Sequence, residues 1–285
     1  MADTQTDQPP HSLPGTSPAP RAVVLRTEGT NCDQEMVRAF RLAGAEVDLV
    51  HVGRVLETPQ ILGAADLIGF PGGFSHGDDI ASGRVLAARL RERAWSALVD
   101  AADRGVPMIG ACNGFQVMVQ VGLLPGPAAG EAWTVDRAPA PTCALAHNTS
   151  ARFVDRWTRV RYEPGNCVWT EGLAEFDAEV AMLPVAHGEG RFVAADGVLD
   201  RLESAGQVVV RYAEPLNGSQ GDVAGIADAN GRIFGLMPHP ERYLDWTRHP
   251  WWTRLDASVR TGDTPGLCMF RSAVRAAVNA VSSGA

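Results

Sequence analysis

The segment Met108–Gln116 combines a reactive side chain with a backbone turn that could expose it. An apolar run leads into Cys112, which has glycines at positions 110 and 114 around it, and a helical pattern follows. This arrangement is typical of a nucleophile elbow, because a side chain at either glycine would collide where the backbone reverses from strand to helix. Unpaired N–H groups and the dipole at a helix start would stabilise a thiolate there. We therefore predict that Cys112 is a nucleophile rather than a buried structural cysteine.

A histidine and a carboxylate two residues apart could supply the acid–base chemistry that this nucleophile needs. The run Gly235–Glu241 ends a β-like segment with His239, which stands between two prolines and two residues before Glu241. The prolines restrict the backbone and hold both side chains outward. His239 can act as the general base and acid, while Glu241 fixes its tautomer. Since an isolated His-x-Glu is more often a surface turn, this assignment depends on its combination with Cys112.

A second glycine-rich turn could complete the site. Residues Phe70–Ser75 follow another β-like run, which places them at the carboxyl edge of a parallel sheet, where α/β sites form. A thioester-forming cysteine needs N–H donors for the tetrahedral oxyanion. The backbone groups of Gly73 and Asn113 are predicted to supply one donor each, although an ordinary tight turn would give the same residues.

Two clusters of histidine and acidic residues suggest a metal site as an alternative use of these loops. They are residues 76–79 (HGDD) and 187–191 (HGEGR). Such residues can bind hard or borderline cations. Neither cluster has the H-x-x-x-H or C-x-x-C spacing of a structural zinc site, and loops of this composition are frequently solvated or in contact with substrate. We expect no metal ion.

The elements around these turns predict an α/β fold. Strands are expected at residues 22–25, 47–52, 66–70 and 106–111; helices are expected from possible caps at Thr30 and Asn31 through Ala43, ended by Gly44, and at 81–103. This alternation implies a doubly wound, mainly parallel sheet with flanking helices. Later β-like runs at 152–154, 208–212, 223–227 and 232–237 predict an antiparallel extension, followed by a helix near 267–281. The tryptophan-rich segment 245–264 is expected to be a surface loop or an interface.

Composition limits the domain organisation and the partners. The 285 residues are 45% hydrophobic, enough for a sizeable core, and we expect one domain over residues 21–285 after a disordered tail at 1–20. The formal net charge is −8 with no basic block, so nucleic acid and anionic lipid are not expected partners. No apolar run is long enough to span a membrane, and the N-terminus lacks a signal core.

Cysteine and lysine usage adds two further expectations. The five cysteines are widely spaced and odd in number, which favours a reducing compartment, and we expect a cytoplasmic protein. All 25 basic residues are arginine. The chain therefore cannot have a P-loop lysine or a Schiff-base lysine, and any ATP that its pathway requires must bind mainly to another protein.

Six short runs, taken together, resemble those of a known family. They are Gly29–Asp33, Pro71–Ser75, Cys112–Gln116, Ala186–Arg191, Leu216–Ser219 and Met237–Arg242. The order of the three motifs resembles the class I glutamine amidotransferases, and the full set resembles the glutaminase subunits of phosphoribosylformylglycinamidine synthase. The cysteine turn is shared by the whole class, whereas Asn113–Phe115 and the loop beginning at His187 are specific to the family. The resemblance covers most of residues 21–243.

This resemblance implies hydrolysis of glutamine to glutamate and ammonia through a thioester on the nucleophile. The family's nucleophile, base and orienting carboxylate fall on Cys112, His239 and Glu241, and its oxyanion turn falls on Gly73 and Asn113. These are the same positions to which the residue types point.

The resemblance also implies a glutamine-binding surface. Gln116, Ala186, His187, Gly188 and Glu189 match segments that hold the amino-acid end of glutamine in related enzymes. It further implies a larger synthetase subunit that binds ATP and magnesium and converts formylglycinamide ribonucleotide (FGAR) to the amidine (FGAM) in purine biosynthesis, often with a small third subunit. An enclosed route for ammonia between the two active sites is expected, because protonated ammonia is not nucleophilic.

Three other functions compete with this one. A glutaminase serving a different synthetase would use the same chemistry, but the loop at His187–Arg191 argues against it. A cysteine hydrolase or peptidase would usually have its histidine soon after the nucleophile, and residues 117–145 contain none. A non-catalytic scaffold of the same fold would not need all three triad residues.

Overall fold

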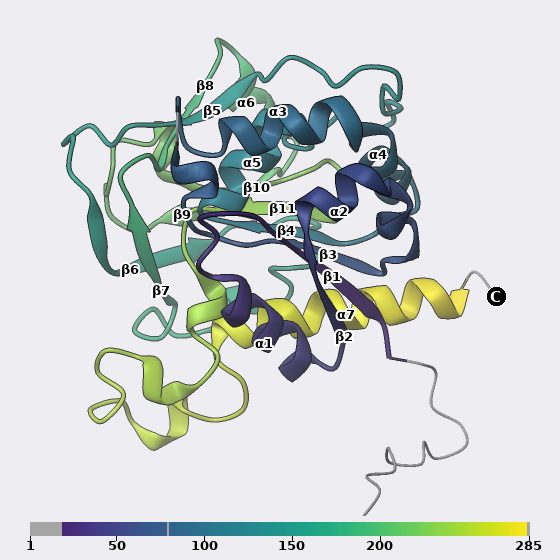
Figure 1. The fold of residues 1–285 in the computed structure, drawn as a ribbon. Coiled ribbons are helices and arrows are strands. Elements are labelled where there is room, and N and C mark those ends of the chain that lie inside the picture. The colour runs from purple at the N-terminus through teal and green to yellow at the C-terminus, as the bar shows by residue number, and fades with distance from the viewer. Residues whose placement is uncertain (1–18, 79, 284–285) are drawn as a thin grey trace, which may run out of the picture.

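The computed structural model describes residues 19–78 and 80–283, so residues 1–18 of the tail predicted at 1–20, and Asp79 of the first histidine-acidic cluster, lie outside the described residues. Among these residues, nine strands form one sheet and helices cover both of its faces (Figure 1). The strand order is β2-β1-β3-β4-β11-β10-β9-β6-β7. The predicted α/β architecture with an antiparallel extension is confirmed.

The parallel half of the sheet carries the predicted turns. It contains β1 (Arg21–Arg26), β2 (Glu46–His51), β3 (Leu67–Phe70), β4 (Met108–Ala111) and β11 (Ile233–Leu236). The prediction assigned the last of these strands to the antiparallel extension, and that was wrong in part. Strand β11 pairs in parallel with β4 and in antiparallel fashion with β10, so it is the strand at which the sheet changes direction.

The antiparallel half is formed by β10 (Val223–Ala227), β9 (Val208–Tyr212), β6 (Val154–Tyr162) and β7 (Met182–His187). A separate two-stranded sheet pairs β5 (Cys143–Ala146) with β8 (Arg191–Ala194), and the short helix α6 (Val198–Ser204) follows it. Because β8 directly follows β7, this small sheet anchors the far end of the loop that contains His187.

Helices α1 (Asp33–Ala43) and α7 (Pro265–Ser283) cover one face of the large sheet (Figure 1). The other face is covered by α2 (Val52–Glu57), α3 (Arg84–Arg93), α4 (Trp95–Asp103) and α5 (Asn113–Val121). Each layer has its own apolar core. Phe40 and Phe270 meet edge to face in the first, with ring centroids 5.1 Å apart, and Phe115 is fully buried in the second.

The long helix predicted at residues 81–103 is instead two helices that meet at Ala94. Tertiary contacts on both sides of the break explain the difference. Arg91 donates to backbone carbonyls of the segments 120–121 and 138–139, and the indole of Trp95 donates to the carbonyl of Thr134. The two anchors fix the end of α3 and the start of α4 separately, and this overrides the continuous helical pattern.

The ends of α1 were predicted only in part. The helix begins one to two residues later than expected, with Cys32 rather than Thr30 or Asn31 at the N-cap. The hydroxyl of Thr30 instead accepts a hydrogen bond from the backbone N–H of Thr27. Gly44 ends the helix in the left-handed conformation at φ 101°, as predicted.

The tryptophan-rich segment 245–264 contains two short 3-10 turns, η6 (Trp246–Arg248) and η7 (Ala257–Val259), and otherwise has no regular structure. In Figure 1 it is the light green excursion that leaves the sheet beside α1. Trp251 and Trp252 are exposed there. In the described ranges, no helix is both long and apolar enough to cross a lipid bilayer.

Candidate active site

The register of three adjacent parallel strands brings the three predicted turns together. Phe70 of β3 is paired with Gly110 of β4, and Leu236 of β11 is paired with Ala111. The N–H of Cys112 donates to the carbonyl of Leu236 at 2.8 Å. The glycine-rich, cysteine and histidine turns therefore leave the sheet at the same carboxyl edge, where α/β sites form.

Cys112 occupies a strained backbone conformation at the start of α5. Its φ of 51° and ψ of −108° are unfavourable for a residue with a Cβ, and such outliers gather at functional sites. The two flanking glycines are required by close backbone approaches. A Cβ at Gly114 would overlap the carbonyl oxygen of Phe70, and a Cβ at Gly110 would lie 2.7 Å from the carbonyl carbon of Gly114. The strand–turn–helix elbow predicted around Cys112 is thus present.

Substituting Gly114 with alanine is expected to destabilise the fold by about 1–3 kcal/mol or more, because the new methyl group must displace the main chain of β3. Urea unfolding measures the effect. Gly63→Ala is the matched control, since a Cβ there meets nothing within 4 Å. Equal unfolding midpoints for the two variants would contradict the packing argument.

His239 and Glu241 form a buried, hydrogen-bonded pair on the turn that follows β11. Nδ1 of His239 lies 2.7 Å from Oε1 of Glu241, and the residues are only 2% and 1% exposed. A carboxylate oxygen can only accept, so Nδ1 carries the proton and Nε2 remains unprotonated in the neutral ring. Nε2 has no hydrogen-bond partner among the described residues. It is therefore available to exchange a proton with Cys112.

The charge of the imidazole ring is set by its neighbours. Burial lowers the pKa of His239, but the Glu241 carboxylate and then the Cys112 sulfur outweigh burial, and the pKa lies well above its usual value. The Cys112 thiol itself is directed at the carbonyl oxygen of Ala186, 3.6 Å away. A rotation of the thiol toward His239 would bring donor and acceptor together, as is common when catalytic hydrogen bonds tighten only with substrate bound.

A cavity of about 160 Å³ opens at Cys112. It is lined by Gly73, Phe74, Asp78, Ser82, Cys112, Gln116, His147, Phe153, Ala186, His187, Gly188 and Glu189. The structure thus brings together every predicted glutamine-binding residue and the predicted oxyanion glycine. Two carboxylates on its wall, Asp78 and Glu189, suit a ligand with a cationic amino group.

The polar groups of this cavity hold one another in place. The Gln116 amide donates to the carbonyl of Glu189, and the Ser82 hydroxyl donates to Asp78 at 2.9 Å. Burial raises the pKa of Asp78, the Ser82 hydrogen bond opposes that shift, and nearby Glu189 adds to it. The side chain of Asn113 is already engaged, because its amide oxygen accepts from the N–H of Ser75 and its amide nitrogen donates to Oε1 of Gln116 at 2.9 Å. Only the backbone N–H of Asn113, which has no intrahelical acceptor, can serve an oxyanion.

The sequence interpretation missed the polar network that holds the loop at His187–Gly190. Nδ1 of His187 lies 3.2 Å from Oδ1 of Asn148, which also accepts from the N–H of Gly190. Asn217 donates to the carbonyl of Gly190 at 2.8 Å. Burial, with a contribution from His239, lowers the pKa of His187 to about 4, so its ring is neutral. Asn217 belongs to a quoted family run, but nothing in its spacing indicates this contact.

A second missed group lies behind the imidazole. Cys32, His239 and Glu241 place one ligand atom each within 4.8 Å of one another, and among the described residues this is the one group that could hold a metal. The atoms are already engaged, however. Glu241 accepts from His239, and Arg242 donates to the sulfur of Cys32. The predicted clusters at His76 and His187 form no such group in the part of the chain that the structure describes.

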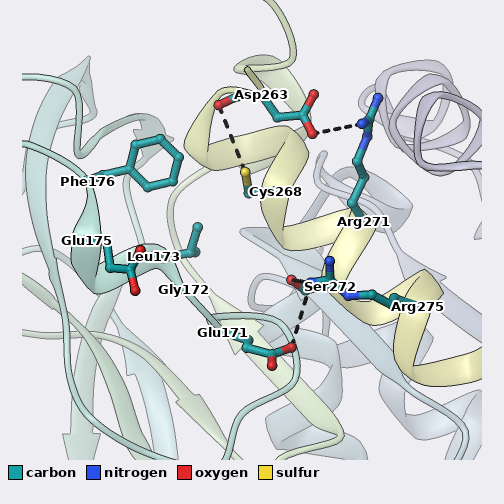
Figure 2. Close-up of a pocket in the computed structure, with 10 residues that line it drawn as sticks. All are labelled: Glu171, Gly172, Leu173, Glu175, Phe176, Asp263, Cys268, Arg271, Ser272 and Arg275. Atoms are coloured by element: carbon teal, nitrogen blue, oxygen red, sulfur yellow. Dashed lines mark hydrogen bonds and ion pairs between the residues drawn. The ribbon is translucent and has the colours of Figure 1, made fainter. Parts of the chain in front are cut away.

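A larger cavity, of about 490 Å³, lies between α7 and the 3-10 turn η3 (Leu173–Glu175) (Figure 2). Four of its five charged residues form two ion pairs. Arg271 contacts Asp263 at 2.9 Å, and Arg275 contacts Glu171 at 3.8 Å. Cys268 is directed at the backbone carbonyl of Asp263. The described lining holds no histidine to act as acid–base partner for that cysteine, so size alone does not make this cavity the reactive site.

Comparison with known proteins agrees with this geometry. Residues 19–275 match the model of the CobB/CobQ-like glutamine amidotransferase domain family. The chain is 40% identical to phosphoribosylformylglycinamidine synthase subunit PurQ of Dehalococcoides mccartyi, over 90% of this chain and 96% of the relative. It is likewise 40% identical to subunit PurQ of Frankia casuarinae, over 94% and 98%.

Solved structures extend the comparison. A chain from the structure of PurLQS from Thermotoga maritima superimposes with a TM-score of 0.65 at 30% identity, with 90% of this chain and 99% of that chain covered. A second structure, of a glutamine amidotransferase from the same organism, matches with a TM-score of 0.50 at 15% identity, covering 92% and 99%, and shares the fold alone.

Proposed function

This chain belongs to the CobB/CobQ-like glutamine amidotransferase family, among the PurQ subunits, and we propose that it is the glutaminase subunit of phosphoribosylformylglycinamidine synthase. One structural observation is the main support for the proposed reaction. Cys112 stands on a strained elbow, at the same edge of the sheet as the bonded pair His239–Glu241 and at the mouth of a cavity lined by the glutamine-binding loop. Such an arrangement suits nucleophilic attack on a small amide.

The reaction follows from the positions of these groups. The sulfur of Cys112 attacks the side-chain amide carbon of glutamine as its proton passes to Nε2 of His239. The N–H groups of Gly73 and Asn113 stabilise the oxyanion, and Glu241 stabilises the imidazolium. His239 then protonates the departing nitrogen, which leaves as ammonia. A water molecule, deprotonated by His239, cleaves the thioester and releases glutamate.

The partner in this proposal is a PurL-like synthetase that converts FGAR to FGAM, with a small PurS-like protein as the third component. The relative from Thermotoga maritima supports it, because the name PurLQS joins PurL, PurQ and PurS. ATP and magnesium are assigned to the synthetase, in keeping with the lysine-free chain. The proposal includes neither nucleic acid nor a membrane. It places the protein in the cytoplasm, where five unpaired cysteines would remain reduced.

Glutamate release from glutamine tests this function. The purified chain is assayed alone, with the synthetase, and with the synthetase plus ATP and FGAR. Release should rise in the complete mixture, because ammonia is useful only when its acceptor is present. Mixing with the large subunit of an unrelated glutamine-dependent synthetase is the control.

The outcomes separate the competing functions. If the rate of glutamate release is the same with and without the synthetase, the glutaminase activity is supported and the assignment to purine synthesis is rejected. Absence of release under every condition, from protein whose fold is intact by circular dichroism, would favour a non-catalytic scaffold.

A further inference from the structure

Cys32 lies where three loops of the candidate site meet. The residue is 1% exposed and stands at the N-cap of α1, just after the loop that follows β1. The backbone N–H groups of Asn31 and Cys32 both lie 3.3 Å from the carbonyl oxygen of Gly72, in the turn after β3. The main chain at Cys32 is thus joined to the glycine-rich turn.

The sulfur of Cys32 connects the same point to the histidine turn. Arg242, the residue after Glu241, donates from Nη2 to Sγ at 3.0 Å, and Nδ1 of His239 lies 3.9 Å from Sγ. The thiol donates its own hydrogen to Oδ1 of Asn31 at 3.1 Å. Its lone pairs therefore face the guanidinium and the imidazole N–H. One sulfur atom contacts both a residue directly after Glu241 and the histidine two positions before it.

These contacts make a slot for the imidazole ring. A Cβ on Gly72 would lie 2.7 Å from Cε1 of His239 and 3.2 Å from the sulfur of Cys32, so the glycine, the ring and the sulfur pack without a gap. Glu241 accepts a hydrogen bond from Nδ1 of the ring. With Gly72 and Cys32 beside it, the ring has little freedom to turn away from Cys112.

Resting on the glutaminase function proposed above, we propose that Cys32 is a positioning residue for the triad, whose sulfur, anchored by Arg242, keeps Nε2 of His239 directed toward Cys112. Cys32 does not touch the reacting atoms. Its contribution is to hold the histidine turn against the loops after β1 and β3. Serine would be an imperfect substitute, because its oxygen is smaller and its bond to Cβ is shorter.

The charged and titratable groups around His239 give this role a measurable signature. Glu241 reaches it from its own turn, Cys112 from the elbow, His187 from β7, and Cys32 from the loop before α1. Arg242, on the same turn as Glu241, contacts the sulfur of Cys32. Burial lowers the pKa of His239, whereas Glu241, Cys112 and the hydrogen bond of Cys32 raise it. Removal of the Cys32 sulfur should therefore lower this pKa.

The test compares Cys32→Ala and Cys32→Ser with the unmodified chain, each assembled with the synthetase. For Cys32→Ala, kcat for glutamine hydrolysis should fall roughly 10- to 100-fold, the range seen when supporting contacts of a catalytic group are removed, with little change in KM. The alkaline limb of the kcat profile should move to lower pH, because the imidazolium that protonates ammonia is lost earlier. Cys32→Ser should recover part of kcat through Arg242.

The matched control is Cys143→Ala, which removes another buried thiol in the separate two-stranded sheet. If both alanine variants show the same kcat and pH profile, or if Cys32→Ala raises KM without lowering kcat, the positioning role is wrong.

A second measurement does not depend on activity. NMR titration of the His239 ring should give a lower pKa in Cys32→Ala than in the unmodified chain and Cys143→Ala, and an unchanged pKa would overturn the inference. An inactive unmodified complex with the predicted pKa change would reject the glutaminase function while retaining the contact. An active unmodified complex with no pKa change in Cys32→Ala would support the glutaminase function and reject the positioning role of Cys32.

Discussion

Glutamine-dependent FGAM synthesis should fall by roughly 10⁴-fold or more when Cys112 is replaced by alanine, because no other group near the cavity can form the thioester. The remaining cysteines cannot substitute. Cys32 is held behind the imidazole ring, and burial raises the pKa of Cys143 and of Cys167 to about 12 each. Cys268 lines a different cavity, and burial raises its pKa to about 11. The measurement is the rate of FGAM formation by the complex at saturating glutamine.

The same variant should still make FGAM when ammonia is supplied in place of glutamine, because the substitution leaves the synthetase intact. Cys143→Ala is the matched control and should retain glutamine-dependent synthesis. If Cys112→Ala kept more than a small fraction of that synthesis, Cys112 would not be the nucleophile.

Replacing His239 by glutamine should lower the glutaminase rate by about 10²- to 10⁴-fold, the usual contribution of a positioned acid–base group. The variant keeps a hydrogen-bonding side chain beside Glu241 but cannot carry a proton from Cys112 to ammonia. Its KM should change less than its kcat, since His239 is absent from the lining of the cavity. Steady-state kinetics of the complete complex provide both constants.

The double variant with Cys112→Ala gives a sharper control. Residues that act as one catalytic unit are strongly non-additive, so the second substitution should cause little further loss. If the loss of rate in the double variant equalled the product of the two single-variant losses, His239 would act independently of the cysteine.

The parts of the fold that depend on local patterns could be predicted from the sequence. The apolar run at Met108–Ala111, the glycines at 110 and 114, and Gly44 each specify their own conformation, and the structure has the elements they imply. The break at Ala94 could not be predicted, because it depends on hydrogen bonds from Arg91 and Trp95 to segments far along the chain. Likewise, the parallel pairing of β11 with β4 joins segments far apart in the sequence, and strand periodicity does not predict it.

In the candidate site, too, features set by local sequence could be predicted and features set by long-range contacts could not. Residue type and turn chemistry were sufficient to propose Cys112, His239 and Gly73 as site residues, because the geometry that each role requires lies within one turn. The loop predicted to bind glutamine was inferred from the family resemblance, and the structure explains its shape through Asn148 and Asn217. No sequence pattern places Cys32 against His239, since the contact joins residues 207 positions apart. The roles of these residues in catalysis remain predictions until the variants are measured.

Ammonia freed at Cys112 is expected to reach the synthetase that consumes it. The most direct measurement supplies the complete complex with glutamine carrying ¹⁵N in its amide, in the presence of excess unlabelled ammonium, and determines the isotope in FGAM by mass spectrometry. We expect almost all of the FGAM to carry ¹⁵N, and we expect the label to be lost in Cys112→Ala. Unlabelled FGAM from the unmodified complex would contradict it.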